Sequence, residues 1–277
     1  MRIKKIGLVR IVIILFIISV AIIEVFPYFW MVTGSFKTLK EIIAFPPSLF
    51  PDTPQYSNYA IAWNSGPFPR YILNSLLVTA SILVIQLVLC CLAAYAFAKI
   101  SFPGKGFLFV IILACMMVPE QIRFVPLYIL FSKVRMIDTY FALVLPFTVS
   151  SLGVFLIRQA FMSIHDDYID AAKLDGAGTL SIIFKLLVPM SKGTLIAFSL
   201  FSIIYHWNNY FWPLVMTSRD EARTLPVGIA MLREQGTGAR WHIIMAGNMF
   251  SVIPIFLIFL FAQKAIMKSF AMTGLKG

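Results

Sequence analysis

Long apolar stretches constrain this chain more than any other feature of its sequence. Six of them, separated by clusters of charge, proline and glycine, lie near residues 11–33, 71–98, 107–126, 141–161, 194–216 and 243–266. A helix needs about 20 consecutive apolar residues to cross a bilayer, and each stretch is at least that long. Only 13% of the 277 residues are charged and 60% are hydrophobic, whereas a soluble domain carries about 25% charged residues. The sequence therefore predicts an all-α membrane protein with about six transmembrane helices.

Positive charge near the first stretch predicts its orientation. The first ten residues hold four basic side chains, and the apolar run behind them has no convincing cleavage site, so we expect a retained helix and not a removed signal. The segment 34–70 spreads three basic residues among six prolines, which indicates an irregular external loop. Because basic residues in short flanks favour the cytoplasmic side, a six-span chain in the cell membrane should have both termini in the cytoplasm.

The remaining charge pattern excludes several classes of protein. The net charge of +11 comes from basic residues scattered through short loops, which does not predict a nucleic-acid partner. The cysteines Cys90, Cys91 and Cys115 lie in apolar runs without metal-ligand spacing, so neither a metal site nor a disulfide is expected. The chain also lacks GxxxxGK[ST], HExxH and GxSxG motifs. We therefore expect a non-catalytic chain that binds no cofactor itself, and not an intramembrane enzyme.

Charge is nearly absent from the predicted spans. We place one acid, Glu24, clearly within a helix and one imidazole, His206, within another. Ion-driven transporters carry intramembrane charges as relays, so a secondary transporter is the alternative class that this pattern disfavours. Glu24 precedes Pro27, and it either lines a wet space at a helix kink or pairs with a neighbouring polar group.

The segment 163–192, between the fourth and fifth predicted spans, is far longer than the 2–8 residues that usually connect two helices. Asp166 and Asp167 suit the positive end of a helix dipole, Gly176 ends that helix, and Pro189 ends the next one. Two short helices joined by a small-residue elbow are suited to docking in a groove of a partner protein. The alternative is an amphipathic helix at the lipid headgroups, where acidic residues would be repelled by anionic lipid.

Within this segment, Asp170-Ala171-Ala172, then three residues, Gly176, nine residues, and Leu186-Leu187-Val188-Pro189 resemble the EAA loop of ABC importer permeases. The family pattern is EAA, three residues, Gly, nine residues, then Ile-x-Leu-Pro, and Asp175-Gly176-Ala177 is similar to its common DGA form. Asp for Glu, Leu for Ile and Val for Leu are departures that preserve chemical type. The resemblance implies these ATPase-coupling residues: Asp170, Ala171, Ala172, Asp175, Gly176, Ala177, Leu186 and Pro189.

Other segments resemble the carbohydrate branch of that family, and specifically its maltose-type second permease. They include Phe102-Pro103-Gly104-Lys105, Met117-Val118-Pro119, Asp138-Thr139-Tyr140 and Trp207-Asn208-Asn209-Tyr210-Phe211-Trp212-Pro213-Leu214. The resemblance implies a type I ABC importer permease fold with a cytoplasmic coupling helix between the fourth and fifth spans. It divides the chain into a first helix and external loop (1–70), a permease domain (71–266) and a cytoplasmic tail (267–277).

The same resemblance implies partners and a substrate class. The partners are a second, dissimilar permease, two ATP-binding-cassette ATPase subunits that hold ATP and Mg, an extracytoplasmic sugar-binding protein, and the lipid bilayer. The substrate would be a sugar, with glycerol 3-phosphate or another polyol as the alternative within the family.

Candidate translocation-path residues are Asn74, Ser75, Trp207, Asn208 and Asn209, which combine amide or hydroxyl groups with an aromatic ring. For Asn74 and Ser75 we favour hydrogen bonding between helices over contact with substrate. For the group at 207–209 we favour an interfacial aromatic belt and helix packing.

Overall fold

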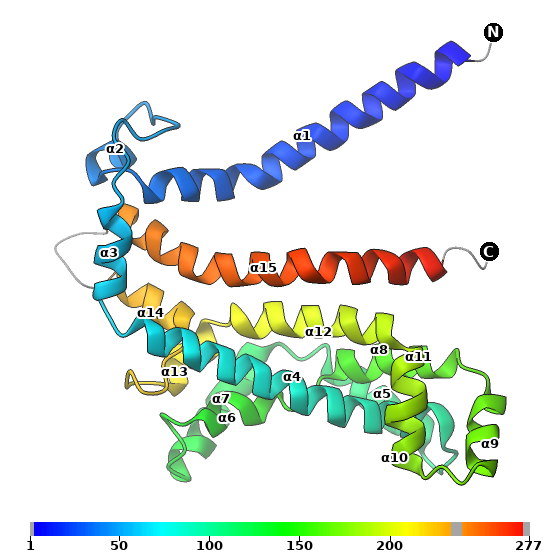
Figure 1. Cartoon of the computed structure of the whole chain (residues 1–277). Coiled ribbons are helices and arrows are strands. Elements are labelled where there is room, and N and C mark those ends of the chain that lie inside the picture. The colour runs from blue at the N-terminus through cyan, green and yellow to red at the C-terminus, as the bar shows by residue number, and fades with distance from the viewer. Residues whose placement is uncertain (1–2, 234–239, 274–277) are drawn as a thin grey trace. The chain divides into compact units, whose positions relative to one another are not determined.

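The computed structural model describes residues 3–233 and 240–273, and every regular element within them is a helix (Figure 1). The chain forms two compact units. The first contains the residues up to Pro67 together with Ile229–Val252, and the second contains Phe68–Gly228 together with the residues from Ile253 onward.

Three helices are long and apolar enough to cross a membrane by themselves. They are Arg10–Ser35 within α1 (Ile3–Ser35), α4 (Phe68–Lys99), and Trp241–Leu260 within α15 (Trp241–Thr273). The last predicted span was expected to end at residue 266, but α15 stays helical to Thr273. The predicted division at 1–70, 71–266 and 267–277 stays a prediction, and residues 274–277 of that tail lie outside the described residues.

Three further candidate spans are bent helix pairs. One pair joins α5 (Lys105–Cys115) and α6 (Glu120–Lys133) at 93°. The second joins α7 (Tyr140–Val144) and the 3₁₀ turn η1 (Leu145–Phe147) to α8 (Ser151–Met162) at 44°. The third joins the helical segment Thr179–Met190 to α12 (Lys192–Trp207) at 86°. The described residues thus hold three to six candidate spans, and the prediction of an all-α membrane protein is confirmed.

The straight helices expected at 107–126, 141–161 and 194–216 were wrong in detail, because each expected range crosses a break. Pro119 has an extended ψ of 140° directly before α6, which a helix interior cannot accommodate. At the other two breaks the chain leaves the helix at Ser150 and at Asn208, where α8 and α13 (Phe211–Met216) begin shortly afterwards.

In the first unit, the predicted irregular loop 34–70 includes two short helices, α2 (Leu39–Ile43) and α3 (Ser57–Asn64). The fully buried Lys37 donates a hydrogen bond of 2.5 Å to a loop carbonyl, and its ammonium lies 4.2 Å from the ring centroid of Trp30. Because a buried charge is costly unless it is paired, these contacts fix the loop around the lysine.

In the second unit, α4 packs against α8 and α12 (Figure 1). Their core continues into α9 (Asp166–Leu174) and into the segment formed by α10 (Thr179–Ser181), the π-helical turn η2 (Ile182–Leu187) and α11 (Val188–Met190). A second core lies around Trp212 of α13, between α4, α6 and α7. The first residue of α14 (Leu225–Met231) donates its backbone N–H to the hydroxyl of Ser75 in α4.

Candidate functional site: an exposed helix pair and a polar break in a span

The N-terminus of α9 is tied to the end of α4. The ammonium of Lys99 donates hydrogen bonds of 2.6 Å to the carboxylate of Asp166 and 2.6 Å to the carbonyl of Ile164. The Lys99 side chain is 7% exposed, and its hydrogen bond is the main reason that the pKa of Asp166 lies below its ordinary value. Asp166 also lies in the first turn of α9, where a carboxylate is stabilised by the helix dipole. Position and charge together fix where α9 begins.

The two faces of α9 differ in burial. Ile169 is 3% exposed and belongs to the core of the second unit. Asp167, Asp170, Ala171 and Leu174 recur at helical spacing on the outer face and are exposed, with Leu174 at 90%. The outer face thus presents the open side chain of Leu174 beside the exposed carboxylates of Asp167 and Asp170. The structure thus places the predicted Asp170 and Ala171 on the free side of the helix.

The elbow after α9 forms a Schellman motif. Gly176 has a φ of +79°, its N–H donates to Lys173, and the N–H of Ala177 donates to Ala172, both at 2.9 Å. This bond pattern is the typical glycine-terminated helix end. Asp175 is the C-cap, so the predicted residues 175–177 together make the turn.

The helical segment after the elbow anchors the pair to the bundle. Ile182, Ile183 and Leu187 are at most 2% exposed and join the same core as Ile169. The predicted Leu186 is partly buried, whereas Pro189 is exposed at the second position of α11. Among the predicted coupling residues, Ala172, Ala177 and Leu186 therefore pack against this core, whereas the remaining five are exposed, namely Asp170, Ala171, Asp175, Gly176 and Pro189. Their coupling role stays a prediction.

The candidate path residues Asn74 and Ser75 are almost completely buried in protein contacts. The amide of Asn74 donates 3.0 and 2.8 Å bonds to the carbonyls of Glu221 and Arg223 and accepts a 2.6 Å bond from Tyr140. Ser75 accepts from the N–H of Leu225 at 2.8 Å. Both side chains hold the segment 221–225 against α4, which is the packing role that we favoured.

The other candidate group lies at the end of α12. Trp207 is 2% exposed, Asn208 is the C-cap and bonds back to Ile204 at 2.9 Å, and Asn209 accepts a 3.2 Å bond from the N–H of Trp212. These contacts form the turn between α12 and α13. A path role for these residues stays a prediction.

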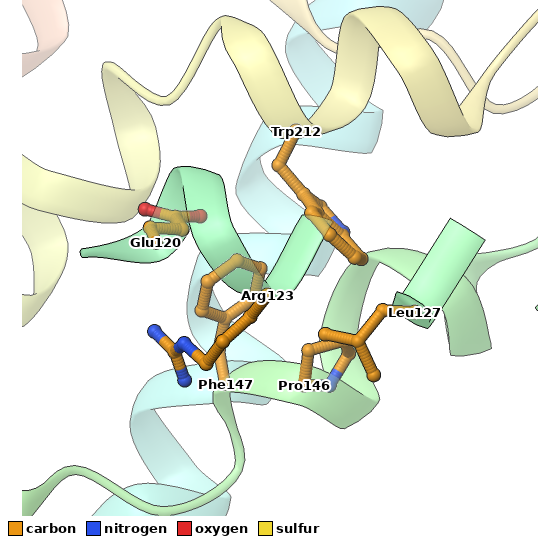
Figure 2. Close-up of a pocket in the computed structure, with 6 residues that line it drawn as sticks. All are labelled: Glu120, Arg123, Leu127, Pro146, Phe147 and Trp212. Atoms are coloured by element: carbon orange, nitrogen blue, oxygen red, sulfur yellow. The ribbon is translucent and has the colours of Figure 1, made fainter. Parts of the chain in front are cut away.

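A small, mainly apolar pocket that the sequence analysis missed lies at the break between α5 and α6 (Figure 2). Its lining residues come from α6, the turn at 145–147 and α13, namely Glu120, Arg123, Leu127, Pro146, Phe147 and Trp212. The expectation that Glu24 is the one acid clearly within a span was wrong, since Glu120 lies inside the predicted span 107–126. Pro119, next to two charged residues within four positions, is the sequence signal that indicates a break there.

Among residues 3–233 and 240–273, no three His, Cys, Asp or Glu side chains gather closely enough to hold a metal ion.

These features define a class: a multi-span helical membrane protein that presents a short helix pair, anchored on one face and open on the other. Residues 86–271 match the family described as binding-protein-dependent transport system inner membrane component, and the chain belongs to that family. It is a multi-pass inner-membrane permease of the sugar ABC importer family.

Relatives of known name are similar along almost the whole chain. The arabinooligosaccharides transport system permease protein AraQ of Bacillus subtilis (strain 168) is 31% identical over 271 residues, which cover 97% of this chain and 96% of the relative. The sn-glycerol-3-phosphate transport system permease protein UgpE of Escherichia coli O1:K1 / APEC is 31% identical, covering 91% and 92%. These relatives are transport permeases, as expected for a non-catalytic membrane subunit.

Solved structures share the fold. A chain of a bacterial ABC transporter involved in the import of the acidic polysaccharide alginate superposes with a TM-score of 0.79 at 22% identity, covering 95% of this chain and 98% of that one. A chain of a bacterial alginate ABC transporter in complex with an alginate pentasaccharide-bound periplasmic protein gives a TM-score of 0.61 at 17% identity. The predicted type I importer permease fold is confirmed.

Proposed function

We propose that this chain is one permease of an importer that moves a sugar across the cytoplasmic membrane, driven by ATPase subunits that dock on α9. The observation that carries the proposal is the open outer face of α9. The opposite face packs on a buried core, and the ion pair between Lys99 and Asp166 holds the start of the helix. A lever needs one rigid attachment and one free docking surface, and α9 has both.

The docking surface has the chemistry of a protein interface. Leu174 offers an apolar anchor, and Asp167 and Asp170 can pair with basic groups on a partner. Asp170 already pairs with Lys173 at 3.0 Å, so a basic partner group would compete with this exposed pair, which is worth little in water. Ala171 and Gly176 have no bulky side chain and permit close approach.

The rest of the assembly follows from the family. A second, dissimilar permease would complete the pathway, and an extracytoplasmic binding protein would deliver the sugar, as the name of the family implies. ATP and Mg would be held by two partner ATPases, which places α9 and both chain termini in the cytoplasm. The names of the relatives favour an oligosaccharide, with sn-glycerol 3-phosphate as the second candidate.

Substitution of Leu174 tests the docking role. We expect Leu174→Glu to abolish recovery of ATPase activity with the tagged chain from native membranes in mild detergent, because a carboxylate replaces the apolar anchor. The matched control is Leu174→Met, which keeps an apolar side chain of similar volume. Because the side chain is 90% exposed, neither change should alter the thermal stability of the chain itself.

Recovery of the ATPase with Leu174→Glu at the wild-type level would show that α9 is not the docking element. If the wild-type chain itself brings no nucleotide-hydrolysing companion, the proposal of an ATP-driven importer fails.

A further inference from the structure

The first helix gives a depth scale for the loop that follows it. Arg10 is the last basic residue before the apolar run, and Trp30 is an amphipathic aromatic residue near the other end of that run. The helix rises about 30 Å between them at about 1.5 Å per residue, which is the thickness of a hydrocarbon core. Basic and Trp side chains favour the membrane surfaces. The edge of the hydrocarbon core therefore lies near Trp30, and the end of α1 passes into the headgroup layer.

The loop after α1 folds back to the level of this edge. The helix ends at Ser35, yet the ring of Phe50 packs edge-on against the ring of Phe29, with 5.6 Å between the two ring centroids. Phe29 lies about 9 Å before the end of α1 at about 1.5 Å per residue. The loop therefore returns to the membrane surface and does not point away into water.

Three contacts hold the base of the loop. The ammonium of Lys37 donates to the carbonyl of Ser48 at 2.5 Å, and the amide of Asn58 donates to the carbonyl of Lys37 at 2.9 Å. One carboxylate oxygen of Glu41 accepts a 2.8 Å bond from the N–H of Asp52. Residues 42–51 are thus closed at their base, and this backbone holds their side chains where the structure places them.

The closed loop carries large apolar side chains on its outside. Residues 42–51 contain no charged side chain. Phe45 is 96% exposed, Ile43 is 66% exposed and Leu49 is 50% exposed. Exposed apolar side chains that gather within a few positions mark a surface for a membrane or for another protein.

Phospholipid fits this surface best. Through Phe50 the loop is continuous with α1, whose most apolar stretch buries none of its side chains within the chain. Lys40 is exposed one helical turn before Ile43, and a lysine stem can lie along apolar surface while its ammonium meets the phosphates of headgroups. A protein partner from the aqueous phase would instead have to reach apolar side chains at the edge of the hydrocarbon core.

We propose that residues 42–51 form a membrane anchor, in which Phe45, Ile43 and Leu49 insert among phospholipid acyl chains and Lys40 meets the phosphates. The anchor fixes the depth of the end of α1, because Lys37 ties the loop backbone to this end of the helix. The inference concerns the bilayer alone, so it does not depend on the substrate or on the ATPase partners of the proposed importer.

Spin labels test which phase the loop meets. Cys90 and Cys91 are buried, so a chain with Cys115→Ala can be labelled at Phe45→Cys or, as the matched control, at Thr53→Cys, which is exposed beside Asp52 and outside the anchor. The complete transporter is placed in nanodiscs of phosphatidylethanolamine and phosphatidylglycerol. Collision rates of the nitroxide are then measured with oxygen, which concentrates in lipid, and with a nickel chelate, which stays in water.

The ratio of oxygen to nickel collisions should be several-fold higher at position 45 than at position 53. Equal ratios at the two positions would place the loop in water and overturn the inference. A label at position 45 that is shielded from both reagents would show that another protein covers the loop, and that result would also overturn it.

A second pair of variants tests whether Phe45 holds the loop in the membrane. With the label at Leu49→Cys, Phe45→Asp should lower the collision ratio several-fold, because a carboxylate avoids the hydrocarbon, whereas Phe45→Leu keeps an apolar side chain and should leave the ratio unchanged. A ratio that Phe45→Asp does not alter would contradict the anchor.

Discussion

Replacement of Gly176 by alanine should reduce transport through backbone strain alone. Gly176 has a φ of +79°, and a Cβ added there meets no atom of the chain within 4 Å. The left-handed conformation costs an ordinary L-residue about 1–2 kcal/mol, so the equilibrium constant that favours the elbow conformation falls about five- to thirty-fold. We expect ATP-driven uptake in proteoliposomes to fall, by at most a factor in that range.

Two companion variants distinguish strain from a clash with the partner. Gly176→Asn adds a larger side chain, yet asparagine tolerates positive φ far better than alanine does, so it should retain more uptake than Gly176→Ala. Gly178→Ala adds the same methyl group two residues away, where φ is −72° and the space is also open, and it should transport as the wild type does. Wild-type uptake by Gly176→Ala, or equal losses in all three variants, would refute the strain argument.

Three other sites give measurable predictions. Lys99→Met should weaken coupled uptake several-fold by releasing the start of α9. The pKa of Asp166 lies below its ordinary value of about 4, so the ion pair with Lys99 is intact above that pH and is lost only as pH falls through the depressed pKa. Hydrogen exchange of the α9 amides, corrected for intrinsic rates, should therefore show constant protection from pH 5 to 8. Asn74→Asp should lower the free energy of unfolding by about 1–3 kcal/mol for each of the two loop carbonyls that it leaves without a donor. This loss would be measured as a lower Tm, and an unchanged Tm would show that Asn74 does not hold the segment 221–225 against α4. Gly153→Ala should destabilise by about 1–3 kcal/mol, because its Cβ would lie 2.6 Å from the Phe198 ring, and Phe198→Leu should recover part of that loss in the double variant.

The helix pair could be predicted because its signals are local. Three signals lie within about two dozen positions: the acidic first turn of α9, Gly176 at the elbow, and Pro189 near the end of α11. Each acts through the backbone of its own neighbours. Burial of Ile169 on one face also follows from helical spacing. Local chemistry of this kind leaves little for tertiary structure to override.

Contacts between distant segments could not be predicted. Asp138, at a φ of +64°, accepts bonds of 2.5 and 2.9 Å from the N–H groups of Ser218 and Arg219, about 80 residues away. The amide of Asn74 holds carbonyls about 150 residues away. A single sequence shows that such residues are polar and turn-forming, but their partners depend on how the helices pack.

The break at Pro119 was a different kind of miss. Hydropathy averaged over the span 107–126 hides Glu120 and Arg123, because the apolar residues around them are enough to satisfy a 20-residue window. The local signal was present, since the residue before a proline avoids the helical region. A proline followed at once by charge, inside an apolar run, therefore indicates a broken span and a candidate functional site.

The same contacts that anchor α9 also reach the pocket. Ile169 of α9 and Phe198 of α12 belong to one core. About two turns further along α12, Tyr205 donates its hydroxyl to Glu120. Since each methylene withdrawn from such a core costs about 0.8 kcal/mol, a pull on α9 moves α12 with it more readily than it opens the core. The hydrogen bond from Tyr205 to Glu120 is then the contact through which docking on α9 would move the break before α6.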